Sequence, residues 1–217
     1  MIKAVFTDID GTLKNSQRKV TEHTKEVLRK CKEENLEIIL VSGRSREHML
    51  KFKEELALSD YLISSNGADI YNEKDDVTIY SSCINKIELK ILYNYVKQNG
   101  YRIKLNYEDK MLVNKAFHPD ELLCIKKDEE ILDIIDKKEI VQCVVMNSDL
   151  NKMKAFKQYF YAHFKDLKIE NESKKLIDES LPEMEQYYCD IINKDVSKGQ
   201  AVEKLARKLY GSTTEIV

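Results

Sequence analysis

Glycine and proline are scarce in this chain, and several features that would define a class of protein are missing. The 217 residues include 6 glycines and only 2 prolines, with no repeat and no obvious linker. The 5 cysteines are odd in number and show no CxxC spacing. We therefore interpret them as reduced, partly buried thiols of a cytoplasmic protein. No histidine flanks any of them, which argues against a catalytic cysteine.

The chain also lacks an excess of charge and a long apolar run. It has 36 basic and 38 acidic side chains, for a formal net charge of −2. This balance gives no field that would attract nucleic acid or an anionic membrane. No apolar run approaches the ~20 residues that span a bilayer, and the N-terminus lacks a signal-peptide pattern. We expect neither a nucleic acid nor a membrane as partner.

Strand and helix patterns alternate over the first part of the chain. Ile2–Thr7, Leu36–Val41 and Tyr61–Ser64 are predicted strands, and Thr21–Asn35 and Arg46–Leu56 are predicted helices. Strands that alternate with helices indicate βαβ units and a mainly parallel sheet. The length suits one large domain or two modest ones.

The alternation stops after residue 68 and returns near the end of the chain. Short strands at 69–71 and 77–80 predict a hairpin that leads out of the sheet, and Asn85 is placed to cap a helix. Ser197 is placed to cap a late helix that Gly211 ends. We therefore expect a core of residues 1–81 and 188–217, with residues 82–187 inserted as an α+β domain.

The run Val5–Leu13 contains the most informative residues. Asp8 and Asp10 end a β-favouring segment, and Gly11 and Thr12 follow at once. Residues two apart in a strand project to the same side, and two adjacent carboxylates repel each other unless a cation lies between them. A Gly-Thr turn can aim backbone N–H groups at an anion. The run therefore predicts a metal-assisted phosphate site, although a strand that simply ends in a turn would explain either aspartate alone.

Other polar residues follow the predicted strands, where open α/β sheets bind ligands. They are Ser42, Gly43, Arg44, Asn66 and Gly67, together with Lys198 at the start of the late helix. Asn66-Gly67 is also an ordinary turn signal. Two roles stay open for Arg44, which can bind substrate or pair with a carboxylate of the core. A helix N-terminus favours anions, so Lys198 is well placed beside a phosphate.

These segments resemble, in order, the motifs of the haloacid dehalogenase-like superfamily. Asp8–Thr12 resembles its DxDGT motif, Ser42 its second motif and Lys198 its third. Asn66-Gly67 resembles the Asn-Gly that follows the third strand in the Cof-type branch, which contains sugar-phosphate phosphatases. The resemblance covers essentially the whole chain. It implies an α/β fold, in which a Rossmann-like core with a parallel sheet carries an inserted α+β cap of the C2 type.

The resemblance also implies a reaction. It is the Mg²⁺-dependent hydrolysis of a small phosphomonoester, a sugar phosphate or phosphorylated cofactor, through an aspartyl-phosphate. Asp8 would be the nucleophile and a metal ligand, and Asp10 would be the general acid and base, with its backbone carbonyl on Mg²⁺. Lys198 would keep Asp8 ionised. Ser42 would contact the phosphoryl group, and the neighbouring glycines, Thr12, Arg44 and Asn66 would line the pocket.

A fourth family motif, an acidic loop of the approximate form GDxxND, has no counterpart in this sequence. Thr214–Val217 resembles the start of the strand that precedes this loop, and the printed sequence ends there. We expect a core truncated at its C-terminus, with an incomplete sheet edge that favours self-association. Two alternatives to an active phosphatase stay open. One is a non-catalytic phospholigand-binding or interaction module, and the other is a phosphomutase.

Overall fold

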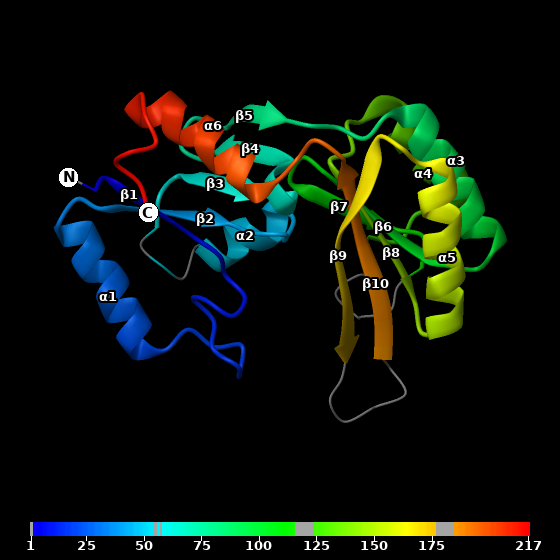
Figure 1. Ribbon diagram of the computed structural model, residues 1–217, viewed down its shortest axis with the longest axis horizontal. Coiled ribbons are helices and arrows are strands. Elements are labelled where there is room, and N and C mark those ends of the chain that lie inside the picture. Colours follow the sequence, from blue (N-terminus) through cyan, green and yellow to red (C-terminus); the bar gives the residue numbers. More distant parts are fainter. Residues whose placement is uncertain (1, 54–55, 57, 116–123, 177–184) are drawn as a thin grey trace. The chain divides into compact units, whose positions relative to one another are not determined.

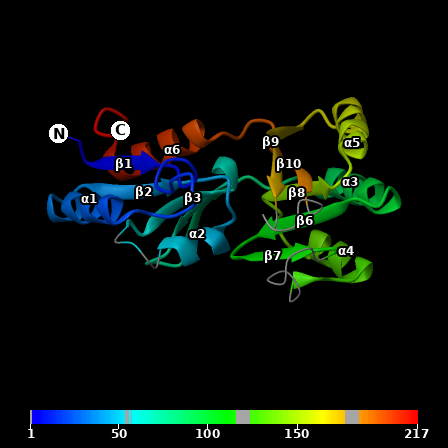
Figure 2. The ribbon, with the colours of Figure 1, turned by 90° about the horizontal axis from the view of Figure 1, so that it is seen from below.

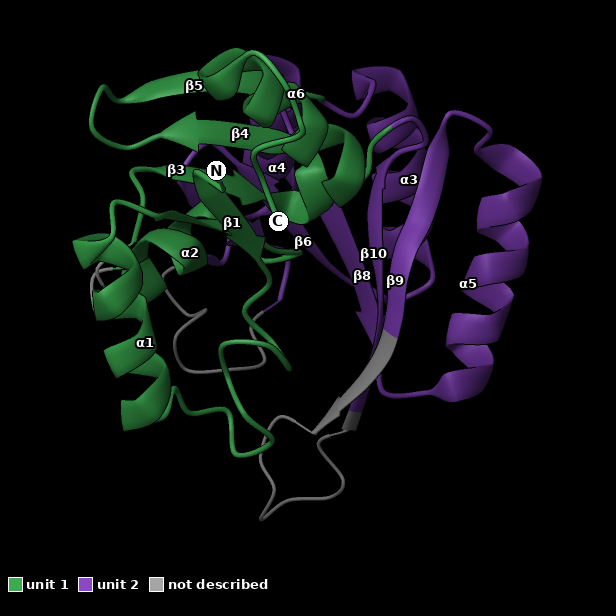
Figure 3. Ribbon diagram, turned by 60° about the vertical axis from the view of Figure 1, so that its left-hand side comes forward, with its two compact units in different colours: residues 1–82, 196–217 green, residues 83–195 purple. Residues whose placement is uncertain are grey.

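The computed structural model describes residues 2–53, 56, 58–115, 124–176 and 185–217. The chain forms two compact units (Figure 3). One contains residues 1–82 and 196–217, and the other contains residues 83–195. Among the described residues, no helix combines the length and apolar character that crossing a bilayer requires.

The first unit is built on a five-stranded sheet in the order β1-β2-β3-β4-β5. The first three strands are parallel, as the βαβ pattern predicts, and β4 and β5 are antiparallel additions. Its elements are β1 (Ala4–Thr7), α1 (Glu22–Glu33), β2 (Glu37–Val41), α2 (Arg46–Lys53), β3 (Tyr61–Ser64), the 3₁₀ turn η1 (Ser65–Gly67), β4 (Asp69–Asn72), β5 (Val77–Ser81) and α6 (Lys198–Tyr210).

Helices cover both faces of this sheet. On one face, Leu28 of α1 and Met49 of α2 pack with apolar side chains of β2 and β3. On the other face, Ala201 and Leu205 of α6 pack against strand residues that include Ile39. Figure 2 shows α6 and α2 on opposite sides of the strands. Alternate residues of β2 therefore enter two different cores, which explains why this strand is apolar on both faces.

The predicted hairpin does not leave the sheet. Leu62 of β3 pairs with Tyr71 of β4, and β5 pairs with β4, so both strands extend the same sheet (Figure 1). The reason is the turn between β3 and β4, where Ser65 and Asn66 have positive φ angles of 50° and 59°. This turn reverses the chain at once, and β4 returns along β3.

The second unit is an antiparallel sheet with helices on one face. Its strand order is β7-β6-β8-β10-β9. Apolar residues of its described helices and of alternate strand positions form one core, and Tyr93, Phe156 and Phe160 are the largest fully buried side chains described there. The elements are α3 (Lys86–Gln98), β6 (Arg102–Tyr107), β7 (Lys110–Val113), α4 (Asp128–Lys137), β8 (Gln142–Asn147), α5 (Leu150–His163), β9 (Leu167–Leu176) and β10 (Glu185–Asn193).

Two details of the second unit differ from the sequence analysis. The boundary expected between residues 187 and 188 falls inside β10. This strand pairs with β9 along its length and with β8 over part of it, so the whole strand belongs to the second unit, which ends at residue 195. Helix α4 was not predicted, although Ile131 and Ile135 are buried at helical spacing. Part of the predicted helix at 46–56 lies outside the described residues.

The end of the chain adds to the edge of the first sheet at β1. The amide of Lys3 donates to the carbonyl of Glu215 at 2.8 Å, and the amide of Phe6 donates to the carbonyl of Val217 at 2.8 Å. Ile216 forms a parallel bridge with Ala4. The segment therefore lies where the sequence analysis expects the next core strand to begin.

Candidate active site

Asp8 follows β1 directly and forms an ion pair with Lys198. The Nζ atom of Lys198 lies 2.9 Å from Oδ2 of Asp8, and the amide of Ile9 donates to Oδ1 at 2.7 Å. Lys198 is the first residue of α6, which Ser197 caps by accepting from the amide of Gln200. The cap and the pairing of β1 in the sheet thus bring together two residues 190 positions apart.

Asp10 pairs with a different cation. Nε of Arg44 donates to Oδ2 of Asp10, and Nη2 donates to Oδ1, both at 2.7 Å. This is the two-pronged geometry that a planar guanidinium makes with a carboxylate. The hydrogen bonds to Asp10 raise the pKa of Arg44, with a smaller contribution from the charge of Asp8. Two roles were left open for Arg44, and the structure shows the pairing with a carboxylate. The carboxylate is that of Asp10, which is itself a predicted site residue.

Three loops hold these residues at the end of the parallel strands. Ser42 is 2% exposed, its amide donates to the carbonyl of Ile63 at 2.9 Å, and its carbonyl accepts from the amide of Asn66 at 3.0 Å. The amide of Ser65 donates to the carbonyl of Arg44 at 2.8 Å. The loop after β2 is therefore bonded to β3 and to the turn that follows it, and it has little freedom.

Two glycines lie at close approaches of the turn after β3, and at Gly67 the neighbouring atoms are backbone. A Cβ atom on Gly67 would lie 2.4 Å from the carbonyl oxygen of Ser197, and its φ of +99° suits glycine. A Cβ atom on Gly43 would lie 2.7 Å from Oδ1 of Asn66. The turn after β3 therefore touches the start of α6 on one side and the loop after β2 on the other. These contacts seat Lys198 close to the other predicted residues.

Two polar groups beside this loop are buried without a hydrogen-bond partner among the described residues. They are Oγ of Ser65 and Nδ2 of Asn66. Both groups can donate a hydrogen bond, and such buried groups are usually satisfied by water or a ligand. Ser65 was not among the predicted site residues. Its position just before Asn66-Gly67, at the end of a strand, is the sequence signal that could have identified it.

Gly11 and Thr12 lie in an exposed turn beside these residues. Gly11 has a φ of +80°, and the turn is closed by the amide of Lys14, which donates to the carbonyl of Ile9 at 2.8 Å. In the described part of the chain, Thr12 forms no hydrogen bond with another predicted site residue. The structure thus brings Asp8, Asp10 and Lys198 together with the loops after β2 and β3, and it leaves Thr12 at the margin.

The charges of the site balance in pairs. Asp8 with Lys198 and Asp10 with Arg44 give two acids and two bases, and all four side chains are between 32% and 53% exposed. Partly exposed ion pairs contribute little to stability, roughly 0–1 kcal/mol each. Their importance is electrostatic, because each cation offsets the repulsion between the two neighbouring carboxylates.

The oxygen atoms of Asp8 and Asp10 determine which metal ion fits. Mg²⁺ prefers oxygen ligands and is commonly held by one or two carboxylates, with phosphate and water in the remaining positions. Across the described ranges, no group of three or more His, Cys, Asp or Glu side chains is placed to hold a metal ion. Asp8 and Asp10 supply oxygen donors of the kind that Mg²⁺ binds, and phosphate and water would supply its other ligands.

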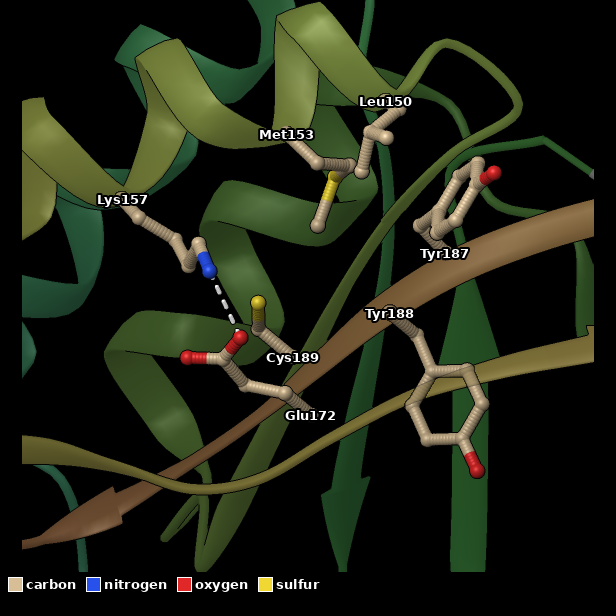
Figure 4. Close-up of a pocket in the computed structure, with 7 residues that line it drawn as sticks. All are labelled: Leu150, Met153, Lys157, Glu172, Tyr187, Tyr188 and Cys189. Atoms are coloured by element: carbon tan, nitrogen blue, oxygen red, sulfur yellow. Dashed lines mark hydrogen bonds and ion pairs between the residues drawn. The ribbon is translucent and has the colours of Figure 1, made fainter.

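A pocket of about 200 Å³ lies in the second unit and contains none of the predicted site residues (Figure 4). Met153 and Lys157 of α5 form one side, and Glu172 and Cys189 form another. Nζ of Lys157 lies 2.6 Å from Oε2 of Glu172, so the charges in the pocket neutralise each other. None of the residues predicted for phosphate chemistry lines this pocket, and the candidate active site is the one in the first unit.

Comparison with known proteins identifies the family. The sequence pattern of the haloacid dehalogenase-like hydrolases matches residues 5–217, and the chain belongs to this family. It is 22% identical over 232 residues to phosphatase YwpJ of Bacillus subtilis, covering 96% of the chain and 79% of that protein. A relative from Buchnera aphidicola is 26% identical over 121 residues, which are 56% of the chain and 40% of the relative.

Solved structures agree on the fold. A haloacid dehalogenase-like hydrolase from Bacteroides thetaiotaomicron superposes with a TM-score of 0.79 at 18% identity, covering 100% of the chain and 80% of that structure. A sugar phosphatase of subclass IIB gives a TM-score of 0.71 at 20% identity, covering 99% and 78%. The α/β fold with a sheet that contains parallel strands, predicted from the sequence, is therefore confirmed.

Proposed function

We propose that this chain carries the active site of a Mg²⁺-dependent phosphatase that hydrolyses a small phosphomonoester. The observation that carries the proposal is the ion pair between Asp8 and Lys198, 2.9 Å long, with Asp10 two residues away on the same loop. A carboxylate that faces a cation at the end of a strand is suited to attack phosphorus. The phosphatase names of relatives, and the sugar phosphatase among the similar structures, support this reaction class.

The reaction has two steps. In the first, a carboxylate oxygen of Asp8 attacks phosphorus and the bond to the leaving oxygen breaks, while the carboxyl group of Asp10 gives that oxygen its proton. In the second, water attacks phosphorus, Asp10 takes a proton from the water, and the bond to Asp8 breaks to release inorganic phosphate. Asp10 thus ends as it began, and the nucleophile is restored.

The other residues bind the phosphoryl group. Lys198 lies at the N-terminus of α6, where the ammonium group and the helix both favour anions. Ser42, Asn66 and the backbone around Gly11 and Gly67 supply neutral donors. Mg²⁺, held by Asp8 and the carbonyl of Asp10, would offset the repulsion between Asp8 and the phosphate dianion. The second unit would act as a cap that selects the leaving group.

The proposal is tested by hydrolysis of 4-nitrophenyl phosphate with and without Mg²⁺. We expect turnover that requires the metal and that Asp8→Asn abolishes, since the amide is not a nucleophile. A matched control is Asp195→Asn, because this aspartate also lies close to Lys198 in sequence but outside the site. Turnover that survives in Asp8→Asn would refute the proposed nucleophile.

A non-catalytic phospholigand-binding module is the second candidate. The observation that favours it is the pairing of both aspartates with protein cations, which gives a compact arrangement with no net charge. Thermal stabilisation by inorganic phosphate or a sugar phosphate, together with no release of phosphate, would identify this function. Release of phosphate would exclude it, and formation of an isomeric sugar phosphate would identify a phosphomutase.

A further inference from the structure

Asp10 and Arg44 form an ion pair in which the exposed Asp10 meets an arginine whose backbone is held by hydrogen bonds. Asp10 lies in an exposed turn next to Gly11, and its side chain is 53% exposed. A short side chain in such a place ordinarily samples several rotamers. Here both carboxylate oxygens accept hydrogen bonds from one guanidinium group, which allows a single orientation.

Hydrogen bonds hold the backbone of Arg44 at its amide and at its carbonyl. Its amide donates to Oγ of Ser42 at 3.3 Å, and its carbonyl accepts from the amide of Ser65 at 2.8 Å. Helix α2 starts two residues later, and Oγ of Ser45 lies 2.7 Å from Nδ1 of His48 in its first turn. The guanidinium group is therefore presented to Asp10 from a rigid support.

We propose that Arg44 is a positioning residue for Asp10, and that it fixes the carboxyl group in the orientation needed to exchange a proton with the leaving oxygen. The proposal rests on the proposed function, which gives Asp10 this role. Each carboxylate oxygen has roughly two acceptor sites, so the guanidinium leaves room for the transferred proton. The competing role for Arg44 is direct binding of the phosphoryl group.

Leaving-group dependence separates the two roles. A sugar phosphate has a poor leaving group that needs a proton, whereas 4-nitrophenolate departs without one. We expect Arg44→Gln to lower kcat/KM for a hexose 6-phosphate by about 10- to 100-fold, part of the ~10²–10⁴-fold that positioned proton transfer contributes. For 4-nitrophenyl phosphate we expect kcat/KM to fall by less than ~3-fold, because kcat/KM covers only the steps up to departure of the leaving group, and 4-nitrophenolate leaves without a proton.

Two further variants make the comparison specific. Arg44→Lys keeps the charge but cannot form the two parallel hydrogen bonds, so it should resemble Arg44→Gln on the sugar phosphate. Arg207→Lys is the matched control, because Arg207 pairs with Glu203 on the exposed face of α6. Full activity of Arg44→Lys on the sugar phosphate would overturn the proposal. So would an equal fall in kcat/KM for both substrates, which would show that Arg44 binds phosphate directly.

A measurement without turnover keeps this inference separate from the proposed function. Three-bond NMR couplings report the χ1 rotamer of Asp10 in the intact chain. We expect one rotamer in the wild type and in Arg207→Lys, and averaged couplings in Arg44→Gln. If Asp10 keeps one rotamer in Arg44→Gln, the positioning role is refuted. If the wild-type chain hydrolyses neither substrate, the proposed function fails, while the couplings still decide whether Arg44 orients Asp10.

Discussion

Replacing Asp69 by asparagine should destabilise the first unit strongly, because it leaves the Arg46 guanidinium buried without its counter-charge. Arg46 is 8% exposed and Asp69 is 2% exposed. Nε of Arg46 donates to Oδ2 of Asp69 at 3.0 Å, and Nη2 donates to Oδ1. Oγ of Ser64 also donates to Asp69, at 2.6 Å. The pair links the start of α2 to β3 and β4, directly behind the loops of the site.

The magnitude follows from this burial. Removing one partner of a buried ion pair costs about 3–5 kcal/mol, because the remaining charge stays desolvated. In a chain of this size each kcal/mol lowers Tm by roughly 2–4 °C, so Asp69→Asn should lower it by about 6–20 °C. Removing both charges, as in Arg46→Met with Asp69→Leu, should recover part of the loss, since apolar residues carry no such penalty.

The assay is thermal and urea unfolding followed by circular dichroism. Glu203→Gln is the control, because it breaks the exposed pair with Arg207 on α6 and should change stability by less than ~1 kcal/mol. An Asp69→Asn variant within ~1 kcal/mol of the wild type would contradict the reasoning, because no buried charge would then have lost its partner. A double variant less stable than the single one would contradict it as well.

Two further predictions concern backbone packing and alkaline pH. Gly67→Ala should lower Tm and weaken phosphate binding far more than Gly211→Ala. Of these two positions, only at Gly67 would the new Cβ atom meet backbone, 2.4 Å from the carbonyl oxygen of Ser197. Equal effects of the two substitutions would contradict this prediction. The hydrogen bond to Asp76 raises the pKa of Tyr71 to about 12. The stability it adds is complete below pH ~10 and is lost as the pH rises towards 12, so Tyr71→Phe should flatten alkaline unfolding curves in that range.

The strands and helices near the site were largely predictable from the sequence. The alternation of apolar strands with amphipathic helices predicted β1, β2 and β3, and Tyr61–Ser64 has the predicted bounds. Ser197 and Gly211 cap α6 as predicted, since capping depends on local chemistry. The course of β4 was not predictable in the same way, because it depends on the left-handed turn at Ser65 and Asn66 and on pairing with β3.

For the site, the sequence predicted which residues to consider and one of their two pairings. Spacing placed Asp8 and Asp10 on one loop, and the family resemblance placed Lys198 beside Asp8, where the structure has it. The sequence could not assign Arg44 to Asp10, because this pair depends on how the loop after β2 packs on the sheet. The individual roles of these residues stay predictions until the variants are measured.

The sequence by itself determined the family of this chain, its α/β fold class and the acidic loop after the first strand, because these follow from local patterns and fixed spacings. Only the tertiary structure decided that Arg44 faces Asp10, and that both loops after β2 and β3 support this pair. The physical reason is that ion pairs between residues far apart in the chain are set by packing, and periodicity along the sequence carries no information about their distance.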